Sequence, residues 1–227
     1  MYTPPMFKSD RATSLAFAEA RGFGTVCAWN GNKPIASPLP FYLDYADDGT
    51  PRAVFHVARG NPLIALADAA ACWLLVVNGS DAYVSPDWYV SPDQVPTWLY
   101  QTLHLTGRVR RLSDDELAAQ LDTLSAKFEG WLAPKKPWTV LKMATARLEA
   151  LKKAIVGLVL TVEEVEGTFK LNQHKSDVDY AAVSHALASQ ADADARTIAG
   201  LMRKVRPLAF AAETESKNEA VAPERSV

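Results

Sequence analysis

The chain has 227 residues, of which 48% are hydrophobic and 22% charged, and its formal net charge is −2. These values are typical of a soluble globular protein and exclude a disordered or fibrous chain. They also lack the strongly basic total of many nucleic-acid-binding domains. The apolar runs are shorter than the roughly 20 residues of a membrane-spanning helix, and the opening MYTPPMF does not have the pattern of a signal peptide. We therefore expect a cytoplasmic protein with no membrane association.

The first third of the chain predicts one helix and three strands. Asp10–Arg21 is expected to be helical, with Ser9 as its N-cap and Gly22 after its last turn. Asn30-Gly31 is a strong hairpin signal. Prolines at 34, 38 and 40 exclude a helix and a fully paired central strand, so the second strand is expected to be an edge strand or irregular. The three predicted strands are Phe23–Trp29, Pro34–Tyr42 and Arg52–Ala58.

The middle of the chain predicts a short helix and two further strands. Asn61-Pro62 opens the helix Pro62–Ala70, and the apolar run Cys72–Asn78 suits a strand that is covered on both faces. Gly79–Pro96 holds three prolines and is predicted to be a long loop, followed by the strand Trp98–Leu112. Because Cys27 and Cys72 lie in apolar runs, we expect both to be buried thiols without a disulfide.

The last half of the chain predicts four helices and a strand pair. Ser113 and Glu116 form a capping box that starts the first of these helices. A composition shift after Phe210 predicts a disordered tail. The predicted elements are a helix to Glu129, a helix Trp138–Lys153, a strand Ile155–Val165, a turn at Glu166-Gly167, an extended piece Thr168–Leu171, and helices Asp177–Ala188 and Asp192–Val205.

Strands joined by hairpins, with helices inserted between some of them, indicate an α+β fold on a small antiparallel barrel. A doubly wound parallel sheet would need regular alternation of strands and helices, which this order lacks. We expect a barrel domain over residues 1–176, C-terminal helices that pack on it over 177–209, and the tail over 210–227.

The motifs of several enzyme classes are absent from the sequence. There is no glycine-rich phosphate loop, no G-x-S-x-G, no HExxH and no CxxC pair. The histidines His56, His104, His174 and His185 are scattered without metal-ligand spacing. We therefore expect no metal site and no catalytic triad.

Two segments of the first half combine an unusual backbone with polar groups. In Lys33–Phe41, KPIASPLPF, the prolines keep the chain extended, which suits either a ligand contact or a proline-protected edge strand. In Phe55–Pro62, FHVARGNP, a strand ends at Arg59-Gly60 and a helix begins. That junction suits a phosphate, or it is an ordinary turn with a solvated arginine.

Two segments of the second half complete the set. Residues 83–100 hold five aromatic side chains, which either pack back on the barrel or line a cleft or a subunit interface. The strand in Gly157–Gln173 ends in Lys170, Asn172 and Gln173, polar groups that suit either a binding site or a solvated strand end.

With Tyr2-x-Pro4-x-x-Phe7 and the blocks AYVSPDWY and VPTWLY…H…GRVR, these segments resemble the PaiB-type family of FMN-binding negative transcriptional regulators. The resemblance covers residues 2–176. It implies an antiparallel split barrel of the FMN-binding, pyridoxamine-phosphate-oxidase-like type, with peripheral helices and a helical C-terminal extension. It also implies an FMN cofactor, a cytoplasmic homodimer and contact with DNA.

The resemblance also implies which residues bind the cofactor. The phosphate would meet the junction around Arg59, and the ring edge would run along Ala36–Leu39. Some residues of the groove would come from the second subunit. The implied cofactor-binding residues are Ala36, Ser37, Pro38, Leu39, His56, Ala58, Arg59, Asn61, Trp88, Trp98, Lys170 and Gln173.

Two other functions remain open. A flavin-dependent oxidoreductase of the same barrel group would need a proton donor, for which Tyr83, His104 and Asp81 are candidates. A domain that no longer binds flavin would explain why Asp81, Leu99 and Leu63 depart from the family pattern. The resemblance favours a regulator over an enzyme.

Overall fold

The computed structural model describes residues 1–211, which divide into two compact units. Unit 1 comprises Met1 and residues 10–78 and 103–166, and unit 2 comprises residues 2–9, 79–102 and those described from 167 on. Three strands of one sheet, β6 (Cys72–Val84), β7 (Thr97–Arg111) and β8 (Ile155–Lys170), contribute residues to both units.

The strands of unit 1 form the predicted antiparallel barrel sheet. Their order is β3-β2-β6-β7-β8-β5-β4, and the β2–β3, β2–β6, β4–β5 and β5–β8 pairs are antiparallel. The edge position predicted from the prolines is confirmed, because β3 ends this order. The strands not yet bounded are β2 (Phe23–Trp29), β3 (Pro34–Pro40), β4 (Tyr42–Tyr45) and β5 (Pro51–Ala58).

One face of this sheet forms the core of unit 1. Val26, Phe55, Leu75 and Leu105 are fully buried there, one from each of four strands. Gly107 on β7 lies so close to β8 that a Cβ atom built on it would be 1.8 Å from the Thr161 carbonyl oxygen. Only glycine therefore permits this approach of the two strands.

The helices of unit 1 are α1 (Arg11–Arg21), α2 (Asp114–Gly130) and α3 (Thr145–Lys153). The capping box of α2 is present as predicted. The N-cap of α1 is Asp10 rather than Ser9, because the Asp10 carboxylate accepts the Thr13 amide at 2.8 Å. The helix predicted from Trp138 begins only at Thr145, since Met143 and Ala144 are extended.

Several predicted boundaries are wrong where neighbouring chain segments extend a strand. β6 runs on to Val84 through the predicted loop, with Ala82 and Val84 buried. β8 passes through the predicted turn at Glu166-Gly167, because β1 (Lys8–Ser9) pairs with Gly167 and Thr168. The predicted strand Pro34–Tyr42 is split at Phe41, and the predicted helix Pro62–Ala70 is a 3-10 helix, Pro62–Leu66.

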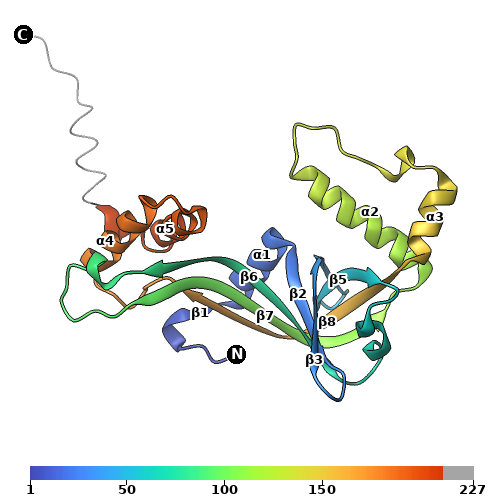
Figure 1. The fold of residues 1–227 in the computed structure, drawn as a ribbon, viewed down its shortest axis with the longest axis horizontal. Coiled ribbons are helices and arrows are strands. Elements are labelled where there is room, and N and C mark those ends of the chain that lie inside the picture. Colours follow the sequence, from blue (N-terminus) through green and yellow to red (C-terminus); the bar gives the residue numbers. More distant parts are fainter. Residues whose placement is uncertain (212–227) are drawn as a thin grey trace, which may run out of the picture. The chain divides into compact units, whose positions relative to one another are not determined.

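Unit 2 is built on α4 (Asp177–Ala188) and α5 (Ala193–Val205), which lie side by side (Figure 1). Tyr180, Val183, Ile198 and Met202 from the two helices are fully buried and pack with residues of β6 and β7. The Tyr180 hydroxyl donates to the Met202 carbonyl at 2.9 Å, which ties α4 to α5.

The described part of the chain ends just after Phe210. Phe210 closes a 3-10 helix, Pro207–Phe210, and is buried, while residues 212–227 of the predicted tail lie outside the described part of the chain.

Both thiols are free, but Cys72 is exposed and Cys27 half-buried, so the prediction that both are buried is wrong. They alternate with the inward-facing Val26, Ala28 and Trp73 and therefore face outward. Within residues 1–211, none of the helices is long and apolar enough to cross a membrane.

Candidate functional site

In unit 1, the edge strand β3 is joined to the turn after β5 by a side-chain contact. The Asn61 Nδ2 donates to the Ser37 Oγ at 2.8 Å, while the Asn61 Oδ1 accepts the Leu63 amide at 3.0 Å. Asn61 is thus the N-cap of the 3-10 helix and at the same time fixes the side chain of Ser37. Two of the predicted site residues, 24 positions apart in sequence, are therefore brought together.

Arg59 lies next to this contact in sequence but binds elsewhere. Its Nε donates to the Lys153 carbonyl at 2.6 Å and its Nη2 to the Ile155 carbonyl at 3.0 Å. The side chain lines a cavity of about 410 Å³ together with Lys152, Lys153 and three acidic residues, Asp114, Asp115 and Glu149. Because of those carboxylates, an anion in this cavity would meet charges of both signs.

The remaining predicted residues of unit 1 differ in exposure. Ala36, Pro38 and Ala58 are exposed, and Leu39 is buried in the barrel core. His56 is half-buried, with its Nδ1 3.2 Å from the Gln120 Nε2, and burial lowers its pKa. The half-buried site therefore disfavours the charged form of His56, and its ring contacts α2.

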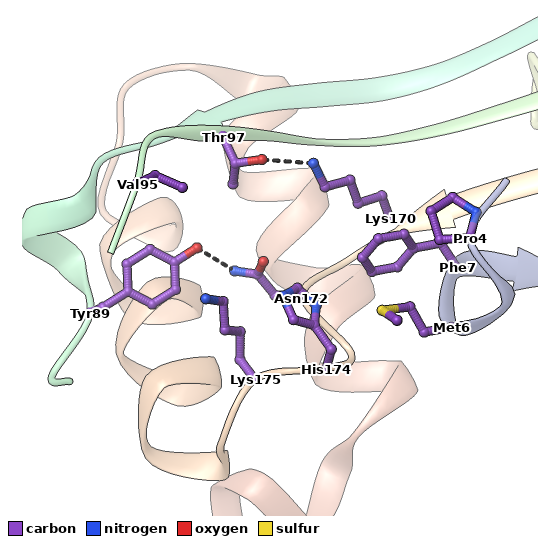
Figure 2. Close-up of a pocket in the computed structure, with 10 residues that line it drawn as sticks. All are labelled: Pro4, Met6, Phe7, Tyr89, Val95, Thr97, Lys170, Asn172, His174 and Lys175. Atoms are coloured by element: carbon purple, nitrogen blue, oxygen red, sulfur yellow. Dashed lines mark hydrogen bonds between the residues drawn. The ribbon is translucent and has the colours of Figure 1, made fainter. Parts of the chain in front are cut away.

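Unit 2 contains a cavity of about 320 Å³ (Figure 2). It lies among the N-terminal segment, the loop after β6, the start of β7 and the turn after β8. None of its ten lining residues is acidic. They are Pro4, Met6, Phe7, Tyr89, Val95, Thr97, Lys170, Asn172, His174 and Lys175.

The polar groups of this cavity are held by one another. The Lys170 Nζ donates to the Thr97 Oγ1 at 2.7 Å, and the Asn172 Nδ2 donates to the Tyr89 hydroxyl at 3.0 Å (Figure 2). The Lys175 Nζ lies 4.9 Å from the centre of the Tyr89 ring and donates to the Gln94 side chain. Asn172 is 0% exposed, and its Oδ1 has no hydrogen-bond partner among residues 1–211.

Three basic side chains line the cavity. Burial lowers the pKa of Lys170, because desolvation disfavours the ammonium form. The pKa of His174 is lowered by burial and then by the charges of Lys175 and Lys170. Three groups that can carry positive charge therefore face a common space, and two of them influence the third.

The turn that carries these groups is fixed from both sides. The Gln173 Oε1 accepts the Leu171 amide at 2.7 Å, and its Nε2 donates to the Phe169 carbonyl. Arg206, the residue that follows α5, donates to the Lys175 carbonyl at 2.8 Å. Asn172 adopts a left-handed conformation with φ of 62°, which asparagine tolerates better than other residues with a Cβ. Gln173, a predicted cofactor residue, therefore stabilises the turn itself.

The two predicted tryptophans lie differently in unit 2. Trp98 is 53% exposed, and its ring meets that of Tyr83 edge-on at 6.0 Å. Trp88 is half-buried and packs against the core of unit 2. Only Trp98 of the two thus presents a largely free ring face in the described residues.

Of the residues that line this cavity, the sequence singled out Lys170 and Asn172 as polar groups at a strand end, but assigned no site role to Phe7, Tyr89, His174 or Lys175. One signal was available in Lys170–Lys175, where three side chains that can be cationic fall within six positions. The contribution of Phe7 and Tyr89 depends on distant segments meeting at this turn, which spacing along the chain does not indicate.

Comparison with known proteins identifies the family. A model described as "Putative FMN-binding domain" matches residues 1–164. The chain belongs to this family. It is 34% identical over 203 residues to the protease synthase and sporulation protein PAI 2 of Bacillus subtilis, covering 89% of this chain and 96% of the relative. The predicted family is confirmed.

Solved structures support the fold. The FAD and heme binding protein of Mycobacterium smegmatis matches with a TM-score of 0.53 and 22% identity, over 72% of this chain and 73% of that one. The flavocytochrome Anf3 of Azotobacter vinelandii matches with a TM-score of 0.51 and 18% identity, over 72% of this chain and 69% of that one. The antiparallel α+β split barrel is confirmed.

Flavin is the cofactor that family membership supports, and residues of unit 1 fit it. The outer edge of β3 offers backbone C=O groups, while its prolines at 34, 38 and 40 have no N–H to donate. Ser37 and Asn61 add a hydroxyl and an amide beside that edge. A flavin ring carries donors and acceptors along one edge, so this set of groups matches its chemistry.

Proposed function

We propose that this protein is a homodimeric FMN-binding regulator of gene expression. The observation that carries the proposal is the family match over residues 1–164, combined with the Ser37–Asn61 contact at the open edge of β3. The regulatory part draws on PAI 2, whose name connects it with protease synthesis and sporulation.

In the proposed complex, the flavin ring edge lies along Ala36–Leu39, and the phosphate lies near Arg59 and Asn61. His56 and Ala58 would border the ring from β5. Pro62 has no N–H, and the Leu63 amide is already bonded to Asn61, so side chains rather than helix amides would hold the phosphate. Arg59 keeps donors beyond the two bonds it makes to carbonyls.

A second subunit would complete the groove. Trp29 is 58% exposed and lines a shallow apolar cavity with Cys27, Cys72 and Leu74 on the outward face of the sheet. An exposed tryptophan surrounded by apolar side chains is typical of a protein–protein contact. We propose that a second copy covers this face and supplies the exposed Trp98 to the flavin groove. Trp88 packs against the core of unit 2, Gln173 is bonded within its own turn, and Lys170 lines the cavity of unit 2.

The basic side chains of unit 1 bear on contact with DNA. Arg108, Arg110 and Arg111 form ion pairs with carboxylates of unit 1 and are therefore partly neutralised. Residues 130–153 hold six basic residues and one acidic residue, and none of these 24 residues is buried. Lys135 and Lys152 pair with Glu129 and Glu149, and the other four basic residues form no ion pair with residues 1–211. We propose this basic segment as the surface that meets DNA phosphates.

The visible spectrum of the purified protein and a calorimetric titration with FMN test the cofactor. We expect flavin absorbance or saturable FMN binding. Asn61→Ala should weaken binding about tenfold, because it removes a polar contact of about 1–2 kcal/mol and releases Ser37. Arg59→Ala should weaken FMN and leave riboflavin, which lacks the phosphate, unchanged.

Asn32→Ala, in the exposed β2–β3 hairpin, is the matched control and should bind FMN as the wild type does. A colourless protein that also ignores added FMN would contradict the proposed function. Equal FMN affinity in the Arg59→Ala and wild-type proteins would show that the phosphate lies elsewhere.

A further inference from the structure

We propose that the cavity of unit 2 is a binding site for a phosphate monoester group, held by Lys170, Lys175 and Thr97, with Asn172 contacting the remainder of the ligand. The chemistry is that of a dianion attached to an organic body. Its source is either the phosphate of a flavin or a separate phosphorylated metabolite. The proposal does not require that FMN bind to unit 1.

The charge of the lining residues indicates that the ligand is an anion. Lys170 and Lys175 form no ion pair within residues 1–211, and no acidic side chain lines the cavity. Their present partners are the neutral oxygens of Thr97 and Gln94. Two ammonium groups beside a hydroxyl match a phosphate monoester, which offers about two negative charges and three acceptor oxygens.

The side-chain oxygen of Asn172 indicates that the organic part of the ligand donates a hydrogen bond. Asn172 is fully buried, and its Oδ1 makes no hydrogen bond with any other residue that the structure describes, although burying such an acceptor without a partner costs about 1–3 kcal/mol. The Nδ2 of the same amide is bonded to the Tyr89 hydroxyl, so the group is held in one orientation (Figure 2). A hydroxyl or N–H on the organic part of the ligand would supply the missing partner.

Apolar side chains would contact the carbon part of the ligand. Met6, Phe7 and Val95 line the same cavity, and Val95 is 72% exposed. The Phe7 ring meets that of His174 edge-on at 5.4 Å, and the Lys170 Nζ lies 6.0 Å from its centre. The cavity thus combines the charged lysines with the apolar Phe7, a combination that suits a small organic phosphate.

Hydrogen bonds within unit 2 hold the polar groups of the site in place. Gln173, Arg206 and the left-handed Asn172 fix the turn from Leu171 to Lys175, as described above. The Asp179 carboxylate accepts the amides of Val90 and Ser91 at 2.9 Å each and so holds the loop beside Tyr89. Preorganised groups lose little freedom on binding, which favours affinity.

Titration calorimetry of flavin-free protein with inorganic phosphate tests the proposal. We expect saturable binding that Lys170→Gln combined with Lys175→Gln weakens at least tenfold. Lys204→Gln, an exposed lysine of α5 in the same unit, is the matched control and should leave affinity unchanged. Far-UV circular dichroism checks folding, and the single variant Lys175→Gln serves if the double variant does not fold.

Titrations with FMN and riboflavin distinguish the two sources. If the cavity holds the flavin's phosphate, inorganic phosphate competes with FMN, and Lys175→Gln weakens FMN but not riboflavin. If the ligand is a separate metabolite, phosphate and FMN bind together, and Lys175→Gln leaves FMN affinity unchanged. Either result supports the site.

Three outcomes would overturn the proposal. They are the absence of saturable phosphate binding, unchanged phosphate affinity in the lysine variants, and tighter binding of the dicarboxylate succinate than of phosphate. Loss of FMN binding in Asn61→Ala with phosphate binding intact would concern the flavin site of unit 1 and not this cavity.

Discussion

Asn172 combines a left-handed backbone with a buried amide, so its replacement should separate the two contributions. Asn172→Ala loses the contact with the Tyr89 hydroxyl and places a Cβ without compensation at φ of 62°. We expect a loss of about 2–3 kcal/mol in the free energy of unfolding. Asn172→Gly loses the same contact, but glycine adopts a positive φ without strain. Its free energy of unfolding should therefore be about 1 kcal/mol higher than that of Asn172→Ala. Urea denaturation measures both, and equal stability of the two variants would contradict this account.

Asp179 gives unit 2 a pH-dependent stability. Hydrogen bonds from the Ser91 hydroxyl and amide, followed by those from Ser176 and Val90, lower its pKa to about 2. Because the pKa is lower in the folded than in the unfolded chain, the stabilisation is complete above about pH 4 and is lost as the pH falls toward 2. In Asp179→Asn this part of the pH dependence should disappear.

The measurement for Asp179 is urea denaturation at pH 5, 3.5 and 2. The difference in unfolding free energy between the wild type and Asp179→Asn should shrink as the pH falls. A constant difference over this range would show that the carboxylate charge has no part in holding the loop.

For single residues, the sequence indicated which types of side chain form the sites but not which of them contact one another. Lys170 was predicted because polar groups follow a buried strand, and Ser37 and Asn61 because each lies in a distinctive segment. The 2.8 Å bond between the latter two depends on β3 approaching the turn after β5, which no local pattern contains. For the same reason Tyr89 and Asn172 were not predicted as a pair.

Among the strands, the approach of β7 to β8 is the strictest local requirement. Gly107→Ala would put its Cβ 1.8 Å from the Thr161 carbonyl oxygen, and backbone cannot yield as a side chain can. We expect a loss of about 3 kcal/mol or more and a melting temperature lower by roughly 6–12 °C. Gly200→Ala is the control, since nothing lies within 4 Å of that position in α5 and alanine favours the helix. Gly107→Ala with wild-type stability would refute the close approach.

The basic segment of residues 130–153 predicts how DNA binding should respond to salt. Replacing Lys136, Lys142 and Arg147 together by glutamine should weaken binding to the protein's own promoter region. It should also reduce the slope of log affinity against log salt by roughly 0.9 per lost phosphate contact. A triple variant at Lys8, Lys33 and Lys204 is the control. No affinity at low salt, or equal slopes, would remove DNA from the proposal.

The bounds of helices and strands were predicted well where caps and composition determine them. They were predicted poorly where pairing with an adjacent strand determines them. The helices α2 and α4 and the strand β2 follow from caps and composition, and their bounds agree within a residue. The ends of β6 and β8 were missed, since Gly79 and Gly167 suggest turns in the sequence. In the sheet, adjacent strands satisfy their backbone groups, so these glycines are accommodated within strands.

For the whole molecule, the exposed Trp29 face predicts the oligomeric state. The wild type should have about twice its chain mass of 24.8 kDa by light scattering, and Trp29→Arg should shift it to the mass of one chain. Leu208→Arg, at a position 85% exposed in unit 2, is the control and should leave the mass unchanged. A wild type with the mass of a single chain would contradict the homodimer.

The overall class was accessible from the sequence because strand order and proline positions indicated an antiparallel barrel. The division into two units was not, since β6, β7 and β8 each pass from one unit into the other without a break. Sequence patterns mark the ends of elements, and here the boundary lies inside them.

That continuity limits how the chain can change in length. β8 belongs to unit 1 up to Glu166 and to unit 2 from Gly167. Successive side chains of a strand point to opposite faces, so one residue inserted at this junction would turn Lys170 away from Thr97 while the barrel upstream stayed intact. Two inserted residues would restore the face and displace the lysine by about 7 Å along the strand. Insertions and deletions that relatives tolerate at this junction are therefore expected in even numbers.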